Sequence, residues 1–122
     1  MTNDLAFRAA IAQGWYFGEY AEHNPSDERR RRKCWLKKRK GLPDYRPDFM
    51  FWIEDYHPEN NPAQALAFAE AKEFYPTVLI SKHQVIAYAG VDARAVAESH
   101  TKPMTELFAE ALTRAVLAAS EE

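Results

Sequence analysis

The segment from Asp48 to Lys72 constrains the fold of this chain more than any other. It opens with "DFMFWIE" at 48 to 54, which is rich in aromatic and branched residues that favour an extended backbone. The next stretch, "YHPENNP" at 56 to 62, contains two prolines and two asparagines, a composition typical of a turn. The segment therefore predicts a strand followed by a reversal of chain direction.

The residues after this turn, "AQALAFAEAK" at 63 to 72, can be interpreted as a helix or as a strand. Alanine favours a helix, and Asn61 followed by Pro62 is a plausible helix start. The larger residues, however, alternate strictly with alanine, which is the period of a strand. We favour the strand, whose larger residues are Leu66, Phe68, Glu70 and Lys72.

A strand at this position predicts a hairpin that gathers charged side chains. Pairing Asp48 with Glu70 centres the reversal on Glu59, inside the turn, and places bulky residues of one strand against alanines of the other. Glu70 and Lys72 are two residues apart, so both share the face of Asp48. Two carboxylates in an apolar setting resist ionisation unless a cation lies between them. We therefore expect Mg²⁺ or Mn²⁺ on Asp48 and Glu70, with Lys72 serving the attacking water.

The remaining pattern predicts helices at both ends of the chain and short elements between. Ser81 followed by Gln84 also matches a capping box, which gives Gln84 a structural alternative to any functional role. The expected elements are a helix over 4 to 20 with Asn3 as its cap, a strand at "PTVLI", a helix from Ser81 to Ala89, a strand over 91 to 98 and an amphipathic helix over 103 to 119.

Positive charge is concentrated in one segment, although the net charge of the chain is −2. In "RRRRKCWLKKRK", residues 29 to 40, nine of the twelve residues are basic. Such a concentration indicates contact with nucleic-acid phosphates, the alternative being a solvated basic loop. Trp35 and Leu36 suggest that part of the segment is anchored to the body of the protein. The expected phosphate-binding residues are Arg29, Arg30, Arg31, Arg32, Lys33, Lys37, Lys38, Arg39 and Lys40.

Length and composition predict one domain, residues 1 to 122, with enough apolar residues for a single core. The lone Cys34 excludes an internal disulfide and an all-cysteine metal site. The start of the chain lacks the apolar region of a secretory signal, and no run approaches the length of a membrane span. We expect a soluble, cytoplasmic protein with no membrane partner.

Three sequence elements, in order, resemble those of the PD-(D/E)xK nuclease superfamily. Pro47-Asp48 matches the PD element, and Glu70-Ala71-Lys72 matches the ExK element. Gln84 with Tyr88 matches the Q-x-x-x-Y pattern of the RecB-like branch. The lead-in "RPDF" is similar to the nuclease subunits of some transposons, and the size and order of elements resemble small Holliday junction resolvases.

This resemblance implies a restriction-endonuclease-like α/β core, with a central mixed β-sheet flanked by α-helices, and metal-dependent hydrolysis of DNA. Asp48, Glu70 and the Ala71 carbonyl would hold Mg²⁺ or Mn²⁺. The family often adds a Glu from the first helix, for which Glu19 and Glu22 are both candidates. Asp44, in the preceding PD pair, is an alternative to Asp48. The remaining implied catalytic residues are Lys72 at the attacking water, with Gln84 and Tyr88 reaching toward the site.

Two other hypotheses stay open at the level of sequence. One is a catalytically inactive module that keeps only the nuclease scaffold and binds DNA or protein in a mobile element or a defence or anti-defence system. The other is an all-helical interaction protein, which requires residues 62 to 75 to be helical. A homodimer or a larger nucleoprotein complex is compatible with an enzyme that cleaves both strands of a DNA duplex.

Overall fold

The chain divides into two units. The computed structural model describes residues 4–22, 30–38, 47–90 and 93–120. Unit 1 comprises Met1–Gln13 with His57–Glu122, and unit 2 comprises Gly14–Tyr56. The α/β class expected from the sequence is confirmed. The described strands form two antiparallel three-stranded sheets, in place of the single central mixed sheet that we expected.

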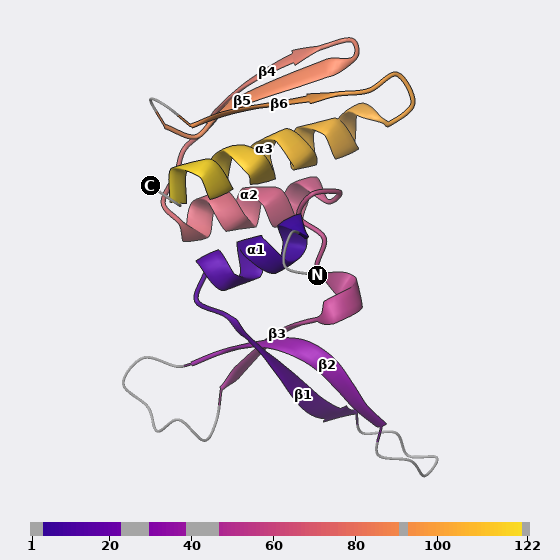
Figure 1. Ribbon diagram of the computed structural model, residues 1–122, viewed down its shortest axis with the longest axis vertical. Coiled ribbons are helices and arrows are strands. Elements are labelled where there is room, and N and C mark those ends of the chain that lie inside the picture. Colours follow the sequence, from indigo (N-terminus) through magenta and orange to yellow (C-terminus); the bar gives the residue numbers. More distant parts are fainter. Residues whose placement is uncertain (1–3, 23–29, 39–46, 91–92, 121–122) are drawn as a thin grey trace. The chain divides into compact units, whose positions relative to one another are not determined.

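Unit 2 is built on the first sheet, in which β2 lies between β1 and β3 (Figure 1). Gly18 of β1 pairs with Cys34 of β2, and a Cβ on Gly18 would approach the side chain of Leu36 within 2.5 Å. Glycine therefore lets Leu36 pack over β1. The elements of unit 2 are β1 (Tyr16–Glu22), β2 (Arg30–Lys37), β3 (Asp48–Trp52) and the short 3₁₀-helix η1 (Ile53–Asp55).

Aromatic side chains pack together in unit 2. The Trp15 ring lies 4.8 Å from Tyr56 and 5.9 Å from Phe51, measured between centroids, and the Phe51 and Tyr56 rings are 5.0 Å apart. Trp15, Tyr56 and Trp35 are buried. The sequence expectation that Trp35 anchors the basic segment is confirmed, because Trp35 is only 2% exposed.

Unit 1 places the long helix α3 between two layers. In Figure 1, α1 and α2 lie on one side of α3 and the second sheet lies on the other, and each of these elements contacts α3. Such a central helix must be apolar on several sides, and its buried residues include Leu107, Leu112 and Leu117. The elements are α1 (Leu5–Ala12), α2 (Pro62–Ala71), β4 (Thr77–Ser81), β5 (Gln84–Tyr88), β6 (Arg94–Glu98) and α3 (Met104–Ser120).

The connection before α2 is tied to the middle of unit 1. The hydroxyl of Thr113 on α3 donates a buried hydrogen bond of 2.9 Å to the carbonyl of Pro58. This bond satisfies the one buried polar side chain of α3 and holds the turn at 57 to 61 against the helix. No described helix is both long and apolar enough to cross a membrane.

The strand that we expected over 63 to 72 is wrong, because this segment forms α2. Asn61 caps the helix by accepting a hydrogen bond from the Gln64 backbone N–H at 3.2 Å, and Pro62 occupies the first turn. The side chains that become buried follow helical rather than strand spacing: Ala65, Phe68 and Ala69. Leu66, which the strand period placed with Phe68, is 49% exposed.

Two further expectations are wrong in the same unit and at its junction. The expected helix from Ser81 to Ala89 is instead the end of β4, a two-residue turn and β5, in which Val85 and Ala87 are buried. The expected helix over 4 to 20 ends at Ala12, and residues 16 to 22 form β1. Asp4 caps α1 through a 2.9 Å bond from Ala6 N–H, and Gly14 follows the helix with φ +80°.

The other elements agree with the sequence. The strand expected over 48 to 54 is β3, although it ends at Trp52. The strands expected at "PTVLI" and over 91 to 98 are β4 and β6. The amphipathic helix expected over 103 to 119 is α3.

Candidate nucleic-acid interface

The basic segment forms the central strand of the unit 2 sheet. Strand β2 carries five basic residues, and exposed Lys38 directly follows it. The sequence prediction of a partly anchored basic segment is confirmed, because Cys34, Trp35 and Leu36 are buried while Lys33 and Lys37 are exposed. Arg29, Arg39 and Lys40 lie outside the described residues. The basic residues of β2 are Arg30, Arg31, Arg32, Lys33 and Lys37.

The neighbouring strands supply fewer opposite charges than β2 supplies positive ones. Glu22 pairs with Arg30, and Glu19 pairs with Lys33, so two of the basic positions have an acid directly across the ladder. Asp48 of β3 occupies the position opposite Lys37. Opposite charges in register stabilise a sheet modestly. Arg31 and Arg32 pair instead with Ala21 and Tyr20, so the sheet keeps an excess of positive charge.

An exposed aromatic ring lies beside this charge. Phe17 of β1 is 47% exposed, although phenylalanine is among the residue types most often fully buried. The Lys33 Nζ lies over the Phe17 ring, 5.7 Å from its centroid, and the Trp35 ring meets Phe17 edge-on at 6.1 Å. A buried tryptophan thus supports a ring whose remaining surface is open to solvent. Phe17 was not among the residues predicted from the sequence. The signal that could have indicated it was its place in "WYFGEY", on the strand that pairs with the basic one.

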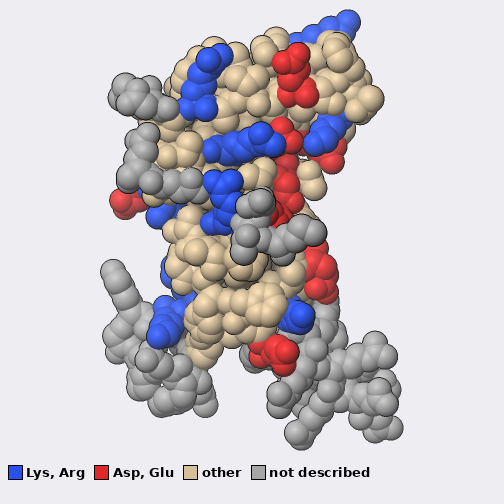
Figure 2. All heavy atoms as spheres, in the orientation of Figure 1, with Lys and Arg blue, Asp and Glu red and all other residues tan. Residues whose placement is uncertain are grey.

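The surface of unit 2 combines uncharged and charged areas. Figure 2 shows a broad area without Lys, Arg, Asp or Glu over the described part of this unit, with blue and red atoms at its margins. Phe49 of β3 is also 41% exposed, but it lies opposite Leu36 in the sheet, whereas Phe17 lies opposite Trp35. Aromatic rings interleaved with cations are the elements with which proteins hold single-stranded nucleic acids.

The hairpin expected to form the metal site is absent. Asp48 begins β3, which pairs with β2, and Asp48 lies opposite Lys37 rather than Glu70. Glu70 is exposed on α2, near the end of the helix and beside a groove lined by Leu66 and Tyr75. Because residues two apart on a helix point in different directions, α2 does not place Glu70 and Lys72 on one face.

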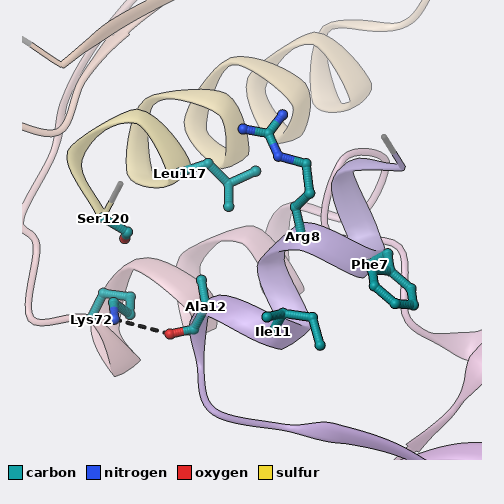
Figure 3. A pocket seen from close by; sticks show the side chains of 7 residues that line it. All are labelled: Phe7, Arg8, Ile11, Ala12, Lys72, Leu117 and Ser120. Atoms are coloured by element: carbon teal, nitrogen blue, oxygen red, sulfur yellow. Dashed lines mark hydrogen bonds between the residues drawn. The ribbon is translucent and has the colours of Figure 1, made fainter. Parts of the chain in front are cut away.

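Lys72 has a structural role at the ends of two helices. It follows the last residue of α2, Ala71, and its Nζ donates a 3.0 Å hydrogen bond to the carbonyl of Ala12, the last residue of α1 (Figure 3). A cation at a helix C-terminus satisfies an unpaired carbonyl and opposes the negative end of the helix dipole. The same figure shows Arg8 and Leu117 around a pocket of about 320 Å³ that Lys72 helps to line.

Gln84 and Tyr88 lie on one face of β5, because residues four apart in a strand point the same way. They are therefore farther apart than one helical turn. The Gln84 side-chain amide lies 3.5 Å from Glu98 Oε2 on β6, and the hydroxyl of Ser81 donates to the Gln84 carbonyl at 3.2 Å. The capping-box alternative for Ser81 and Gln84 is wrong, since both lie at a hairpin turn.

The described residues contain no cluster of three or more His, Cys, Asp or Glu side chains able to hold a metal ion. Glu19 is exposed on β1, on a strand rather than on the first helix, and the same strand holds Glu22. Asp44 lies outside the described residues. Metal binding by Asp48, Glu70, the Ala71 carbonyl or Glu19 stays a prediction.

The chain was also compared with known protein families, curated proteins and solved structures. None of them matched it.

Proposed function

We propose that the sheet of unit 2 binds nucleic acid. The observation that carries the proposal is the position of five basic residues on the central strand of a sheet whose neighbouring strand exposes Phe17. Cations near this sheet would neutralise backbone phosphates, which supplies affinity independent of sequence. The proposed binding residues are Arg30, Arg31, Arg32, Lys33, Lys37 and Lys38, with Arg29, Arg39 and Lys40 as the adjoining part of the basic segment.

The ring of Phe17 favours a single strand over a duplex. Bases are available for stacking only when they are not paired with a complementary strand, and base–aromatic stacking tolerates any sequence. Lys33 lies over the same ring, so a phosphate next to a stacked base would have a cation within reach. The substrate class is therefore single-stranded DNA or RNA, bound without strong sequence preference.

This proposal corresponds to the binding module rather than to the enzyme among the sequence hypotheses. The restriction-endonuclease-like core, DNA cleavage and Mg²⁺ or Mn²⁺ binding stay predictions from the PD, ExK and Q-x-x-x-Y elements. A metal-independent module should bind nucleic acid equally well in EDTA and in Mg²⁺. A nuclease should cleave single-stranded, duplex or branched DNA with Mn²⁺ and lose that cleavage in Asp48→Asn.

The binding proposal is tested by fluorescence anisotropy with a labelled single-stranded oligonucleotide over a series of salt concentrations. Arg31→Gln/Lys33→Gln should weaken binding and reduce the slope of log K against log salt by about 1.4, or about 0.7 per lost phosphate contact. The control, Lys82→Gln/Arg114→Gln, removes the same charge from unit 1 and should leave the slope unchanged. Equal losses in both double variants would show that only net charge matters and would contradict the proposed interface.

A further inference from the structure

The second sheet leaves one face uncovered within unit 1. Val85 and Ala87 of β5 are buried toward α3, so Ile86 between them lies on the opposite side of the sheet. No described element of unit 1 covers that side (Figure 1). We call it the outer face. By strand register it consists of Thr77, Leu79, Ser81, Gln84, Ile86, Tyr88, Arg94, Val96 and Glu98.

The residues of the outer face form three rows across the strands. The central row is entirely apolar: Leu79 pairs with Ile86, which pairs with Val96. Leu79 is 53% exposed and Val96 is 36% exposed, so this row is open to solvent. Apolar side chains aligned on neighbouring strands form a continuous patch, and removing such a patch from water is favourable.

The two outer rows carry opposite charges at the edge strand β6. One row ends in Arg94 and continues to Tyr88 on β5, and the other ends in Glu98 and continues to Gln84. Arg94 and Glu98 are both exposed, and neither forms an ion pair with another described residue. Arg94 and Glu98 therefore lie on opposite sides of the apolar row, each two residues from Val96 along β6.

We propose that this face binds a second copy of the same chain, through a two-fold axis that runs along the central row. Rotation about that axis reverses the strand direction of the second copy. Each apolar residue then faces its own counterpart, so Ile86 meets Ile86. Arg94 of each copy faces Glu98 of the other, which pairs both charges in the dimer. A two-fold axis along the strands would instead place β6 over β4 and leave Arg94 facing the uncharged Thr77.

The size of the face makes this dimer a weak one. Three strands spaced about 4.8 Å apart, each five residues long with a rise of about 3.3 Å, cover roughly 240 Å². This area is below that of a standard protein interface, so the dimer should form only at high concentration. Two sheets packed face to face cross at about −30°, which keeps the Arg94 and Glu98 rows of opposite copies within side-chain reach. The proposal is independent of nucleic-acid binding by unit 2.

The test measures the mass of the full chain by sedimentation equilibrium from about 10 μM to about 1 mM, a range that detects dissociation constants between micromolar and millimolar values. The wild-type mass should rise from 14.1 kDa toward twice that value. Ile86→Lys places a charge against its own copy and should abolish the rise. A wild-type chain that stays monomeric throughout the range would overturn the proposal.

A charge exchange tests the orientation of the two copies. Arg94→Glu and Glu98→Arg should each lower the association constant of the dimer at least tenfold, because each variant places like charges in contact. The double exchange should restore the association constant. Arg114→Glu on α3 makes the same charge change outside the outer face and should have no effect. Circular dichroism of each variant confirms folding. If the double exchange dimerises no better than the single ones, the proposed arrangement is wrong. It is also wrong if all variants dimerise as well as the wild type, which would indicate that the copies pair through another surface, such as the edge strand β4.

Discussion

At the scale of single residues, Phe17 carries the most information about function. Its ring is supported by Trp35 and lies under Lys33, yet it is 47% exposed. The side chain is therefore the best single probe of the proposed interface.

We predict that Phe17→Ala weakens binding of a single-stranded oligonucleotide about tenfold or more, since stacking of one base is worth about 1–3 kcal/mol. Binding of a duplex should change less, because its bases are already stacked. Phe49→Ala, which removes the other exposed phenylalanine of the sheet, is the matched control in an anisotropy assay. Equal effects of the two variants on single strands would argue against a specific role for Phe17.

Cys34 is a second informative residue, this time for stability. The thiol is buried on β2, and burial raises its pKa above the ordinary value of 9.0, because the thiolate is poorly solvated there. Above pH 9 the unfolded chain loses this proton more readily than the folded chain, so this contribution to the free energy of unfolding falls as pH rises.

The thiol should therefore react slowly in the folded protein. We predict that a thiol reagent at pH 8 modifies Cys34 at least about 100-fold more slowly than in urea, because access requires local opening. The decline in stability above pH 9 should be smaller in Cys34→Ala, as measured by urea denaturation at several pH values. Rapid labelling under native conditions would show that the strand opens easily.

At the scale of elements, α2 shows how a strand period can mislead. The alternation of large and small residues over 63 to 72 is real, but alanine occupies half of the positions and favours a helix. Burial then selects Ala65, Phe68 and Ala69, and leaves Leu66 and Glu70 in solvent. A two-residue alternation cannot distinguish a helix from a strand when alanine occupies every second position, because alanine fits a buried face and an exposed face equally well.

At 84 to 88 the error was the reverse, because a helix was expected and the segment forms strand β5. Gln84 and Tyr88 share one face of a strand as well as one face of a helix, so their spacing did not decide between the two. The alternation of buried Val85, Ala87 and Ala89 was the stronger signal. By contrast, β3, β4, β6 and α3 follow from composition or amphipathic pattern, and each agrees with the sequence analysis. Pairing partners, which depend on distant residues, could not be read from local pattern.

The structure assigns Lys72 to the C-terminus of α1, and this assignment predicts a loss of stability. Lys72→Ala removes the 3.0 Å hydrogen bond to the Ala12 carbonyl and should lower the free energy of unfolding by about 1 kcal/mol. Glu70→Ala changes an exposed side chain of the same helix and should alter stability by less than about 0.5 kcal/mol. Thermal and urea denaturation measure the free energy of unfolding of both variants. Equal losses in the two variants would contradict a capping role for Lys72.

At the scale of the whole molecule, charge and exposed apolar surface are unevenly distributed between the two units. More than half of the 16 Lys and Arg residues lie within residues 29 to 40, which belong to unit 2. The uncovered apolar row of Leu79, Ile86 and Val96 belongs to unit 1. The first unit thus carries a surface suited to a second copy, and the second unit carries one suited to phosphate. Sequence alone indicated the basic segment, but the outer face depends on strand register.

The most direct test of the central proposal is an NMR titration of the isotopically labelled full chain with a single-stranded oligonucleotide in EDTA. If the sheet of unit 2 binds the strand, amide resonances of β1 and β2 should shift most, with Phe17 and Lys33 among the largest changes, while those of α2 and α3 stay nearly constant. Changes that gather in unit 1 and leave Phe17 and Lys33 unmoved, or the absence of any change at low salt, would contradict it.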